Sequence, residues 1–365
     1  MILQFGAGNF LRAFADLFID EMNRDPGTAV GKIQVIQSTG TDRAAAINCA
    51  GGRYHVAIQG FRTGSVVNET LEVASIERAY HAGTEWAAIL ELAQDPRLHL
   101  ILSNTTEAGL ALDEADNRFG DLVPASFPAK LLAVLLHRHQ AGLPPLWIMP
   151  CELLDRNGQK LRDLVLQQAN RWEVSGEAVT WLREECRWVN TLVDRIVPGP
   201  PKSHPLLGID PLLLSAEPFA FWAIETDDPE SFPLRHPAIV TAPDIAPYTL
   251  RKVRLLNGAH SALVCKAPEF GIETVRECVE HPELGPWLER LLFQEVVPVL
   301  VDRCDDPEGF ARSVLDRFRN PFLEHRLASI ALNHDAKVAV RLRPTLEEYR
   351  EKFGKEPPLL SEVLR

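Results

Sequence analysis

The stretch that decides the fold stands at the amino terminus and reads Ile2-Leu-Gln-Phe-Gly-Ala-Gly-Asn-Phe-Leu-Arg12. Its first four residues are typical of a strand, and a glycine turn leads into a helix that we expect to run to about Met22. A second strand is expected at 32–38. In such a unit the glycines permit a tight turn and let the backbone approach a pyrophosphate, which the helix amino terminus faces. The stretch predicts the start of a dinucleotide-binding domain.

This turn departs from the usual Gly-x-Gly-x-x-Gly pattern, because Leu11 stands where the third glycine is expected. An acidic residue normally binds the ribose hydroxyls after the second strand, and this chain has Gln37-Ser38-Thr39 there. The choice between NAD and NADP is therefore left open. Arg43 could meet a 2′-phosphate, although a solvated loop arginine is the simpler interpretation.

A nearly continuous apolar run, Leu98-His-Leu-Ile-Leu-Ser103, is typical of a buried parallel strand. It ends in the polar cluster Asn104-Thr-Thr-Glu-Ala-Gly109. Ligands of open α/β sheets bind at the carboxyl ends of the strands, so we expect this cluster to contact the nicotinamide half of a dinucleotide. The alternative is an ordinary turn. A helix at 128–141, a strand at 145–149 and a helix at 153–172 continue the alternation that is typical of an α/β sheet.

The second part of the chain is different. Prolines are too frequent in 227–248 for a central strand or a helix interior, so this segment is expected to connect two domains. Helical periodicity dominates from Tyr248 onward. We therefore predict an α/β Rossmann-like domain at 1–246 and a mainly α-helical substrate domain at 247–365, with the substrate between them.

Composition limits the function. The chain has 365 residues and a net charge of −12, which argues against nucleic acid or an anionic membrane as partner but permits a local positive pocket. No apolar run reaches the ~18–20 residues of a membrane span. Gln4 and Gly6 interrupt the apolar start, which favours a first strand over a signal peptide. The six cysteines are scattered without a Cys-x-x-Cys motif, as expected of reduced thiols in a cytoplasmic protein, and no metal-ligand spacing is evident.

The most reactive set of side chains lies in Lys252-Val-Arg-Leu-Leu-Asn-Gly-Ala-His260. At about 100° per residue on an α-helix, Asn257 would lie about 140° and His260 about 80° round from Lys252. All three then share one side of the helix. A lysine can transfer a proton, an asparagine can donate to a developing oxyanion, and a histidine can hold a hydroxyl group.

The chance interpretation of this stretch is an amphipathic helix whose polar face happens to carry these residues. A catalytic interpretation makes a demand on Lys252, since an exposed lysine with a pKa of about 10.4 is a poor base at neutral pH. Burial or nearby positive charge must lower that pKa, and Arg251 and Arg254 flank the lysine. We expect both to contribute.

Several strings of the sequence, in this order along the chain, carry a family resemblance. The chain resembles the polyol-specific long-chain dehydrogenases, the mannitol dehydrogenase family, over nearly its whole length. The Lys-x4-Asn-x2-His spacing is that family's active-site signature. The strings are GAGNFLRAF at the amino terminus, SNTTEAG at 103–109, NTLVDRIVP at 190–198, KVRLLNGAH at 252–260 and RFRNPFLEH at 317–325.

Within the family, four strings are most similar to the branch that reduces tagaturonate, a keto-hexuronate, to altronate: QST after the second strand, SNTTEAG at 103–109, PCELLDRNG at 150–158 and RKVRLLNGAH at 251–260. Mannitol dehydrogenases usually have a carboxylate three residues before the lysine, where this chain has Thr249. The resemblance also implies further helices after a segment like Lys352–Pro358, and this sequence ends at Arg365. Either the helical domain is trimmed here, or the end of the chain is altered.

The resemblance implies a role for each matching residue. Lys252 would be the general acid in reduction and the base in oxidation, Asn190 and Asn257 would donate to the alkoxide, and His260 would bind a neighbouring hydroxyl group. His325 and Lys337 would lie near the far end of the substrate, with Lys337 paired to its carboxylate. The implied cofactor is NAD, with NADP not excluded, and no metal. The residues expected to bind the cofactor are Gly6, Ala7, Gly8, Asn9, Phe10, Arg12, Ser38, Asn104 and Thr105.

Other functions remain open from the sequence. A sibling enzyme would act on fructuronate or on a neutral polyol such as mannitol. A non-catalytic relative would keep the fold to bind a ligand, although a sensor has no need to keep the proton donor Lys252. The expected partner in each case is a small sugar acid or polyol.

Overall fold

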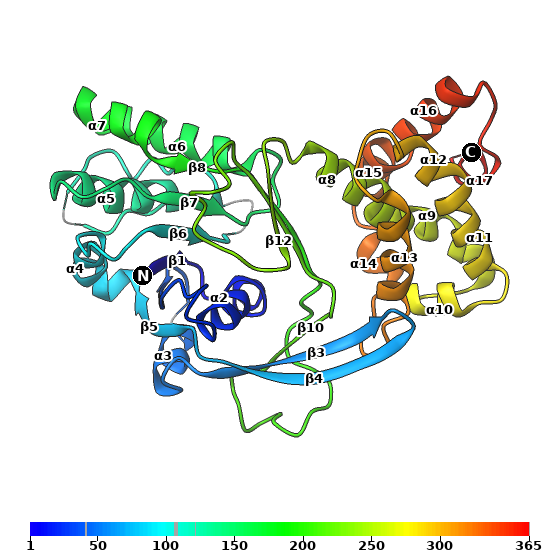
Figure 1. The fold of residues 1–365 in the computed structure, drawn as a ribbon, viewed down its shortest axis with the longest axis horizontal. Helices are drawn as coiled ribbons and strands as arrows, with labels where there is room; N and C mark the ends of the chain where they lie inside the picture. The colour runs from blue at the N-terminus through cyan, green and yellow to red at the C-terminus, as the bar shows by residue number, and fades with distance from the viewer. Residues whose placement is uncertain (41, 106–108, 121, 365) are drawn as a thin grey trace. The chain divides into compact units, whose positions relative to one another are not determined.

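The computed structural model describes residues 1–40, 42–105, 109–120 and 122–364. The chain forms two compact units (Figure 1). Unit 1 consists of Met1–Ala57, Thr70–Ser215 and Ala220–Pro243, and unit 2 of Ile58–Glu69, Ala216–Phe219 and Asp244–Arg365. The second unit thus includes two short segments that precede its main part in the sequence. The predicted boundary between 246 and 247 stays a prediction.

A six-stranded parallel sheet forms the centre of unit 1, in the order β5-β2-β1-β6-β7-β8. Its central strands are buried along their whole length, as the apolar runs predicted. Helices α4 (Ala82–Ala93), α5 (Phe127–Gln140) and α6 (Asn157–Arg171) join the sheet in one hydrophobic core. The strands are β1 Ile2–Phe5, β2 Ile33–Gln37, β5 Ile76–His81, β6 Leu100–Ser103, β7 Trp147–Pro150 and β8 Arg187–Trp188.

The helix predicted after the glycine turn is interrupted. It consists of α1 (Asn9–Arg12) and α2 (Ala15–Asn23), so the prediction of one helix to Met22 was wrong. The cause lies in two backbone carbonyl groups. The oxygen of Arg12 accepts a hydrogen bond from the Tyr54 hydroxyl at 2.7 Å, and that of Ala13 accepts one from Arg195 at 3.1 Å. Both bonds come from residues distant in the sequence.

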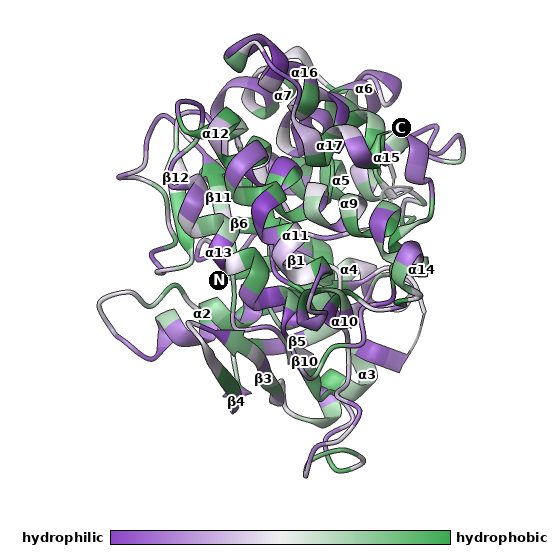
Figure 2. Cartoon of the chain, turned by 90° about the vertical axis from the view of Figure 1, so that its right-hand side faces the viewer, coloured by the Kyte–Doolittle hydropathy of each residue, from purple (hydrophilic) through white to green (hydrophobic). Residues whose placement is uncertain are grey.

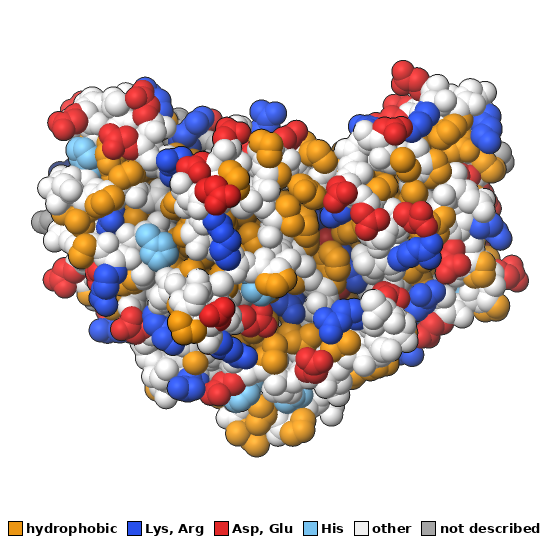
Figure 3. Space-filling model, in the orientation of Figure 1, with side chains coloured by type: hydrophobic (Ala, Val, Ile, Leu, Met, Phe, Trp, Pro, Cys, Tyr) orange, Lys and Arg blue, Asp and Glu red, His pale blue; other side chains and the backbone are white. Residues whose placement is uncertain are grey.

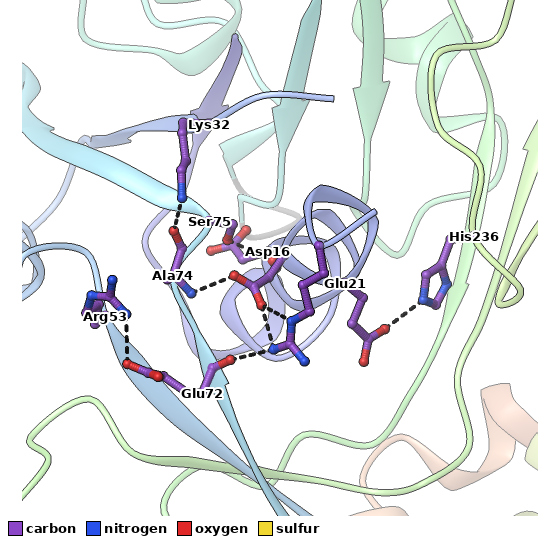
Figure 4. Close-up of polar contacts among 10 residues, drawn as sticks. Asp16, Glu21, Lys32, Arg53, Glu72, Ala74, Ser75 and His236 are labelled. Carbon is purple, nitrogen blue, oxygen red and sulfur yellow. Dashed lines mark hydrogen bonds and ion pairs between the residues drawn. The ribbon is translucent and has the colours of Figure 1, made fainter. Parts of the chain in front are cut away.

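Polar contacts fix α2 beside the sheet (Figure 4). The amide of Ala74 donates to Asp20 Oδ1 at 2.8 Å, and Lys32 donates to the Ala74 carbonyl group. On another side of the helix, Glu21 lies 2.7 Å from His236 Nε2. The helix that follows the glycine turn is therefore held at several points.

The other described strands form two smaller sheets. One has the order β10-β3-β4 and the other β12-β11-β9. The segment 227–248, predicted as a connection, contains β12, which pairs in parallel with β11, so that prediction was wrong for these four residues. Here the prolines stand outside the strand. The strands are β3 Tyr54–Arg62, β4 Ser65–Val73, β9 Thr191–Asp194, β10 Leu214–Ala216, β11 Phe221–Glu225 and β12 Ile239–Ala242.

The carboxyl-terminal part of unit 2 is helical, as predicted, and its helices share one hydrophobic core. Hydrophobic (green) and hydrophilic (purple) residues both occur on the helices of this unit that Figure 2 labels. The short segment 216–219 is fixed by a buried ion pair in which Arg317 donates to both carboxylate oxygens of Glu217 at 2.8 and 2.9 Å. The helices are α8 Ala246–Arg251, α9 Gly258–Lys266, α10 Val275–Glu280, α11 Leu284–Arg290, α12 Val297–Leu300, α13 Pro307–Phe318, α14 Leu327–Ile330, α15 His334–Arg341, α16 Arg343–Phe353 and α17 Pro358–Val363, with π-helical turns at Lys252–Asn257 and Leu291–Val296 and a 3-10 turn at Ala267–Phe270.

Acidic and basic side chains are interspersed over the face shown in Figure 3, without a large patch of one sign. Among the described residues, no helix combines the length and the hydropathy that crossing a bilayer requires. Within the same residues, no group of three histidine, cysteine or acidic side chains is arranged to hold a metal ion.

Candidate active site

A cleft of about 690 Å³ opens in unit 1 at the carboxyl ends of β1, β2 and β6. Strands β2 and β6 flank β1 on opposite sides, so the order in which strands are added to the parallel sheet changes side at β1. In open α/β sheets such a switch point is where ligands bind. The lining residues are Phe5, Gly6, Ala7, Gly8, Asn9, Gln37, Ser38, Thr39, Arg43, Asn104, Thr105, Gly109, Ala111, Leu112, Asp113, Ala125, Ser126, Phe127 and Lys130.

The two glycines of the turn, Gly6 and Gly8, have different structural roles. Gly6 has φ +125°, and a Cβ atom there would lie 3.0 Å from the carbonyl oxygen of Asn104. It therefore permits the close approach of the loops after β1 and β6. A Cβ atom at Gly8 would meet nothing within 4 Å, so this backbone faces open space. Leu11, in place of a third glycine, is buried.

The end of β2 presents neutral groups and one cation to the cleft. Gln37 turns inward, where its Oε1 accepts from the amide of Ala44 at 2.6 Å. Ser38 and Thr39 line the cleft beside Arg43. The Arg43 guanidinium donates to Asn9 Oδ1 at 2.8 Å, so this side chain joins helix α3 (Asp42–Cys49) to the glycine turn. It is more than a solvated loop arginine.

The end of β6 is organised by Glu152, which the sequence reasoning did not select. One carboxylate oxygen of this buried side chain accepts from the Thr105 amide at 2.8 Å, and the other accepts from the Ser103 hydroxyl at 3.1 Å. Burial raises the pKa of Glu152, opposed by these hydrogen bonds. Asn104 is fixed by donating to the Cys151 carbonyl group at 2.7 Å. The position of Glu152, two residues after the end of β7, was the available signal.

Most residues predicted to bind a cofactor line this cleft, namely Gly6, Ala7, Gly8, Asn9, Ser38, Asn104 and Thr105. Phe10 and Arg12 do not. The ring of Phe10 stacks on Phe14 at 4.9 Å. Arg12 is buried, with its guanidinium donating to Leu212 O at 2.8 Å, and burial lowers its pKa to about 10. Residues 106–108 of the predicted polar cluster lie outside the described residues. Lys130 of α5 lines the cleft without a sequence signal.

In unit 2, the stretch from Lys252 to Asn257 is a π-helical turn between α8 and α9. The prediction of a regular α-helix here was wrong, and so was the 140° separation derived from it. Hydrogen bonds of a π-helix join residues five apart, which places Lys252 and Asn257 one above the other. Both are half-buried. The Lys-x4-Asn spacing therefore suits the π-turn better than the α-helix, and such turns are frequent at functional sites.

His260 stands one turn further on, in α9, and is buried. Its ring lies 4.4 Å from that of Phe318 and 4.8 Å from that of His325, centroid to centroid. Burial lowers the pKa of His260 well below its ordinary value, and the charges of Arg317 and Arg341 act in the same direction. Its Nε2 has no hydrogen-bond partner among the described residues. A neutral imidazole with an unused nitrogen is suited to a ligand hydroxyl group.

The remaining predicted residues differ in the contacts that they already make inside the protein. In unit 1, the Asn190 amide is engaged at both ends, donating to Glu225 Oε1 at 2.7 Å and accepting from the Gln159 amide at 3.1 Å. In unit 2, His325 adjoins His260, and burial lowers its pKa. Lys337 donates to the Ile330 carbonyl group at 2.8 Å. Their roles toward a substrate stay predictions.

Both parts of the sequence match family models. The model of the mannitol dehydrogenase Rossmann domain matches residues 1–234, and that of the mannitol dehydrogenase C-terminal domain matches residues 244–363. The chain belongs to the mannitol dehydrogenase family. The resemblance stated from the sequence is thereby confirmed, as is the fold class, and the protein is an oxidoreductase.

Members of the mannitol dehydrogenase family with curated names are similar over the whole chain. The altronate oxidoreductase of Bacillus subtilis (strain 168) is 40% identical over 375 residues, which cover 98% of this chain and 77% of the relative. That of Phocaeicola vulgatus is 37% identical, with coverage of 98% and 77%. The chain therefore spans about three quarters of the length of these relatives.

Two solved structures share the fold. A D-sorbitol dehydrogenase in substrate-free form matches with a TM-score of 0.85 and 23% identity, covering all of this chain and 78% of that one. The Pseudomonas fluorescens mannitol 2-dehydrogenase in ternary complex with NAD and D-mannitol matches with a TM-score of 0.74 and 22% identity, covering 100% and 77%.

Proposed function

We propose that this protein is an NAD-dependent oxidoreductase that reduces the keto group of a hexuronate, tagaturonate, to give altronate. The observation that carries the proposal is the set Lys252, Asn257 and His260, which the π-turn and α9 present within nine residues in a chain about 40% identical to an altronate oxidoreductase. His260 Nε2 supports it, because this buried atom has no hydrogen-bond partner in the part of the chain that the structure describes, and a polyhydroxylated ligand offers one.

The cleft of unit 1 fits a dinucleotide. Gly8 leaves open space where a pyrophosphate approaches the backbone, and Gly6 allows the turn that shapes this space. The neutral Ser38 and Thr39 are placed for ribose hydroxyl groups, and we propose NAD as the preferred form. Arg43 beside them makes NADP the alternative to assay. When bound, the nicotinamide supplies the hydride.

The side chains of this chain supply the proton and the orientation. In the proposed mechanism Lys252 donates its proton to the carbonyl oxygen as that oxygen gains negative charge, and it takes the proton back in the reverse direction. The Asn257 amide donates a hydrogen bond to the same oxygen, which stabilises the developing alkoxide. His260 binds the neighbouring hydroxyl group. Asn190 can act on the alkoxide only if its amide is shared with Glu225, its present acceptor.

Turnover assays test the proposal. Tagaturonate, fructuronate and fructose are each offered with NADH and with NADPH, and kcat/KM is compared. We expect tagaturonate with NADH to be the best pair. Preference for fructuronate would move the assignment to that sibling substrate, and preference for fructose would exclude a hexuronate oxidoreductase. Binding of NADH and sugar acid without any turnover would favour the non-catalytic relative.

A further inference from the structure

Two positively charged side chains lie near His260 in unit 2. Two arginines, Arg317 and Arg341, contribute to the low pKa of His260, so both lie within electrostatic reach of its ring. They come from different helices, α13 and α15. A cation this close to a group that binds a sugar hydroxyl is in position to bind an anionic part of the same ligand.

Arg317 is already neutralised. Its guanidinium donates to both oxygens of Glu217, and both side chains are 2% exposed. The guanidinium also lies over the ring of Phe219 at 4.3 Å. This buried pair joins two segments of unit 2, and binding a second carboxylate would disrupt it.

Arg341 is not neutralised. It is half-buried at the end of α15, and its guanidinium donates to the hydroxyl group of Ser261, the residue after His260, at 3.2 Å. Among the residues that the structure describes, no carboxylate forms an ion pair with it. Burial, with no opposing acid, lowers the pKa of Arg341. A partly desolvated guanidinium with unused donors needs an anion, and its planar fork matches a carboxylate.

We propose that Arg341 binds the carboxylate of the substrate and is the residue that makes this enzyme prefer sugar acids over neutral polyols. The inference rests on the proposed function. Ser261 follows His260 in α9 and fixes the Arg341 guanidinium, which lies within electrostatic reach of the imidazole. In this proposal a ligand whose hydroxyl group binds His260 extends its acid end to Arg341.

Lys337 was the sequence-based candidate for this role, and the structure gives reasons to prefer Arg341. Lys337 precedes Arg341 by one turn of α15, but one of its three donors is used by the Ile330 carbonyl group. The charges that act most strongly on His260 include Arg341 but not Lys337. An ammonium group is also a point charge, whereas two parallel hydrogen bonds from one guanidinium hold a carboxylate in a fixed orientation.

The test compares Arg341→Met, Arg341→Lys and Lys337→Met in the full chain. Arg326→Met is the matched control, because Arg326 is exposed and already paired with Glu324 at 2.6 Å. For each variant, kcat and KM are measured with tagaturonate and with fructose. Dissociation constants of altronate and of uncharged mannitol, measured with NADH bound, give the same comparison without turnover.

We expect Arg341→Met to raise KM for tagaturonate and Kd for altronate by about 30-fold or more, as expected for a lost hydrogen bond to a charged group, with little change in kcat. The values for fructose and mannitol should stay within about threefold, and Arg341→Lys should recover part of the loss. Arg326→Met should resemble the parent protein.

Two results would overturn the inference while leaving the proposed function standing. One is an equal loss for the acid and the neutral ligand in Arg341→Met, which indicates a structural role. The other is an acid-specific loss in Lys337→Met with none in Arg341→Met. If the parent protein neither binds nor turns over any hexuronate, the proposed function itself fails, and this inference fails with it.

Discussion

The cofactor cleft of unit 1 and the Lys252–His260 region of unit 2 are built on different principles. The cleft is shaped by backbone and by side chains whose hydrogen bonds are satisfied inside the protein, such as Asn104 on Cys151 and Thr105 on Glu152. In unit 2, His260 Nε2 has no partner among the described residues, and no described carboxylate is paired with Arg341. The first arrangement is suited to holding a ligand by shape, and the second to a reaction that uses side-chain protons and charges.

The sharpest test of this contrast is Lys252→Ala. Loss of the general acid should lower kcat by about 10²- to 10⁴-fold, while NADH affinity, which depends on unit 1, should change less than twofold. Steady-state kinetics and NADH fluorescence titration measure the two quantities. The control is Lys355→Ala, which removes an exposed lysine of the same unit. If Lys252→Ala kept a tenth of the parent kcat, the lysine would not be the proton donor.

The central strands could be predicted because their apolar runs are buried on both faces, so Leu98–Ser103 contains β6. The break after Arg12 could not, since its cause is a hydrogen bond from Tyr54, 42 residues away. The π-turn was also missed, because the pattern of apolar residues does not show where one hydrogen bond of a helix shifts by a residue.

The candidate site divides in the same way. Lys252, Asn257 and His260 form a compact motif and were found as one. Glu152 and Arg341 act through neighbours distant in the sequence, Thr105 and Ser261, and no local pattern marks them. Reactive residues that are close together in the sequence could thus be predicted. The side chains that orient them could not, because their positions depend on tertiary contacts.

Two buried carboxylates sharpen the comparison of the units, since Glu217 in unit 2 is ion-paired with Arg317 whereas Glu152 in unit 1 accepts hydrogen bonds from neutral donors. Glu217→Gln leaves the buried Arg317 uncompensated and should destabilise unit 2 by about 3–5 kcal/mol. Chemical denaturation measures the change. In Glu308→Gln, which breaks an exposed pair with Arg312, the change should stay below about 0.5 kcal/mol. Equal effects in the two variants would contradict the importance assigned to burial.

Asp16 of unit 1 gives the opposite prediction, because here the neutral form of a buried carboxyl group, and not its ionised form, stabilises the folded protein. Burial raises its pKa to about 7, and its Oδ1 and the Oε1 of Gln4 are buried without a donor in the described residues. The folded protein therefore keeps this proton between pH 3.8 and about 7, where the unfolded chain releases it. The stability contributed by protonated Asp16 is complete below this range and is lost as pH rises through 7.

Asp16→Asn replaces the carboxyl group by an amide that does not ionise, so stability is no longer lost as pH rises. The amide also supplies a hydrogen-bond donor for the Oε1 of Gln4. The variant should be more stable than the parent at pH 8 by at most about 4 kcal/mol, and nearly equal to it at pH 4. Thermal unfolding across this range measures the difference, with the exposed Asp163→Asn as control. A destabilised variant at pH 8 would show that the ionised carboxylate is a stabilising group.

The smallest effects separate the two glycines of the cleft. Gly6→Ala forces a side chain into a positive φ and to 3.0 Å from the Asn104 oxygen, so it should lower the stability of the free protein by about 1–3 kcal/mol. Gly8→Ala meets no neighbour and should leave that stability unchanged, but its methyl group occupies the space assigned to the pyrophosphate. We expect NADH affinity to fall by about tenfold.

Thermal unfolding without ligand and NADH titration, carried out on both variants, resolve these effects. If Gly8→Ala binds NADH with the affinity of the parent protein, the pyrophosphate does not lie against this turn. The cleft of unit 1 would then not bind its ligand through the backbone, as the comparison with unit 2 assumes. If Gly6→Ala is as stable as the parent, the loops after β1 and β6 can separate at little expense, and their close approach does not fix the shape of the cleft.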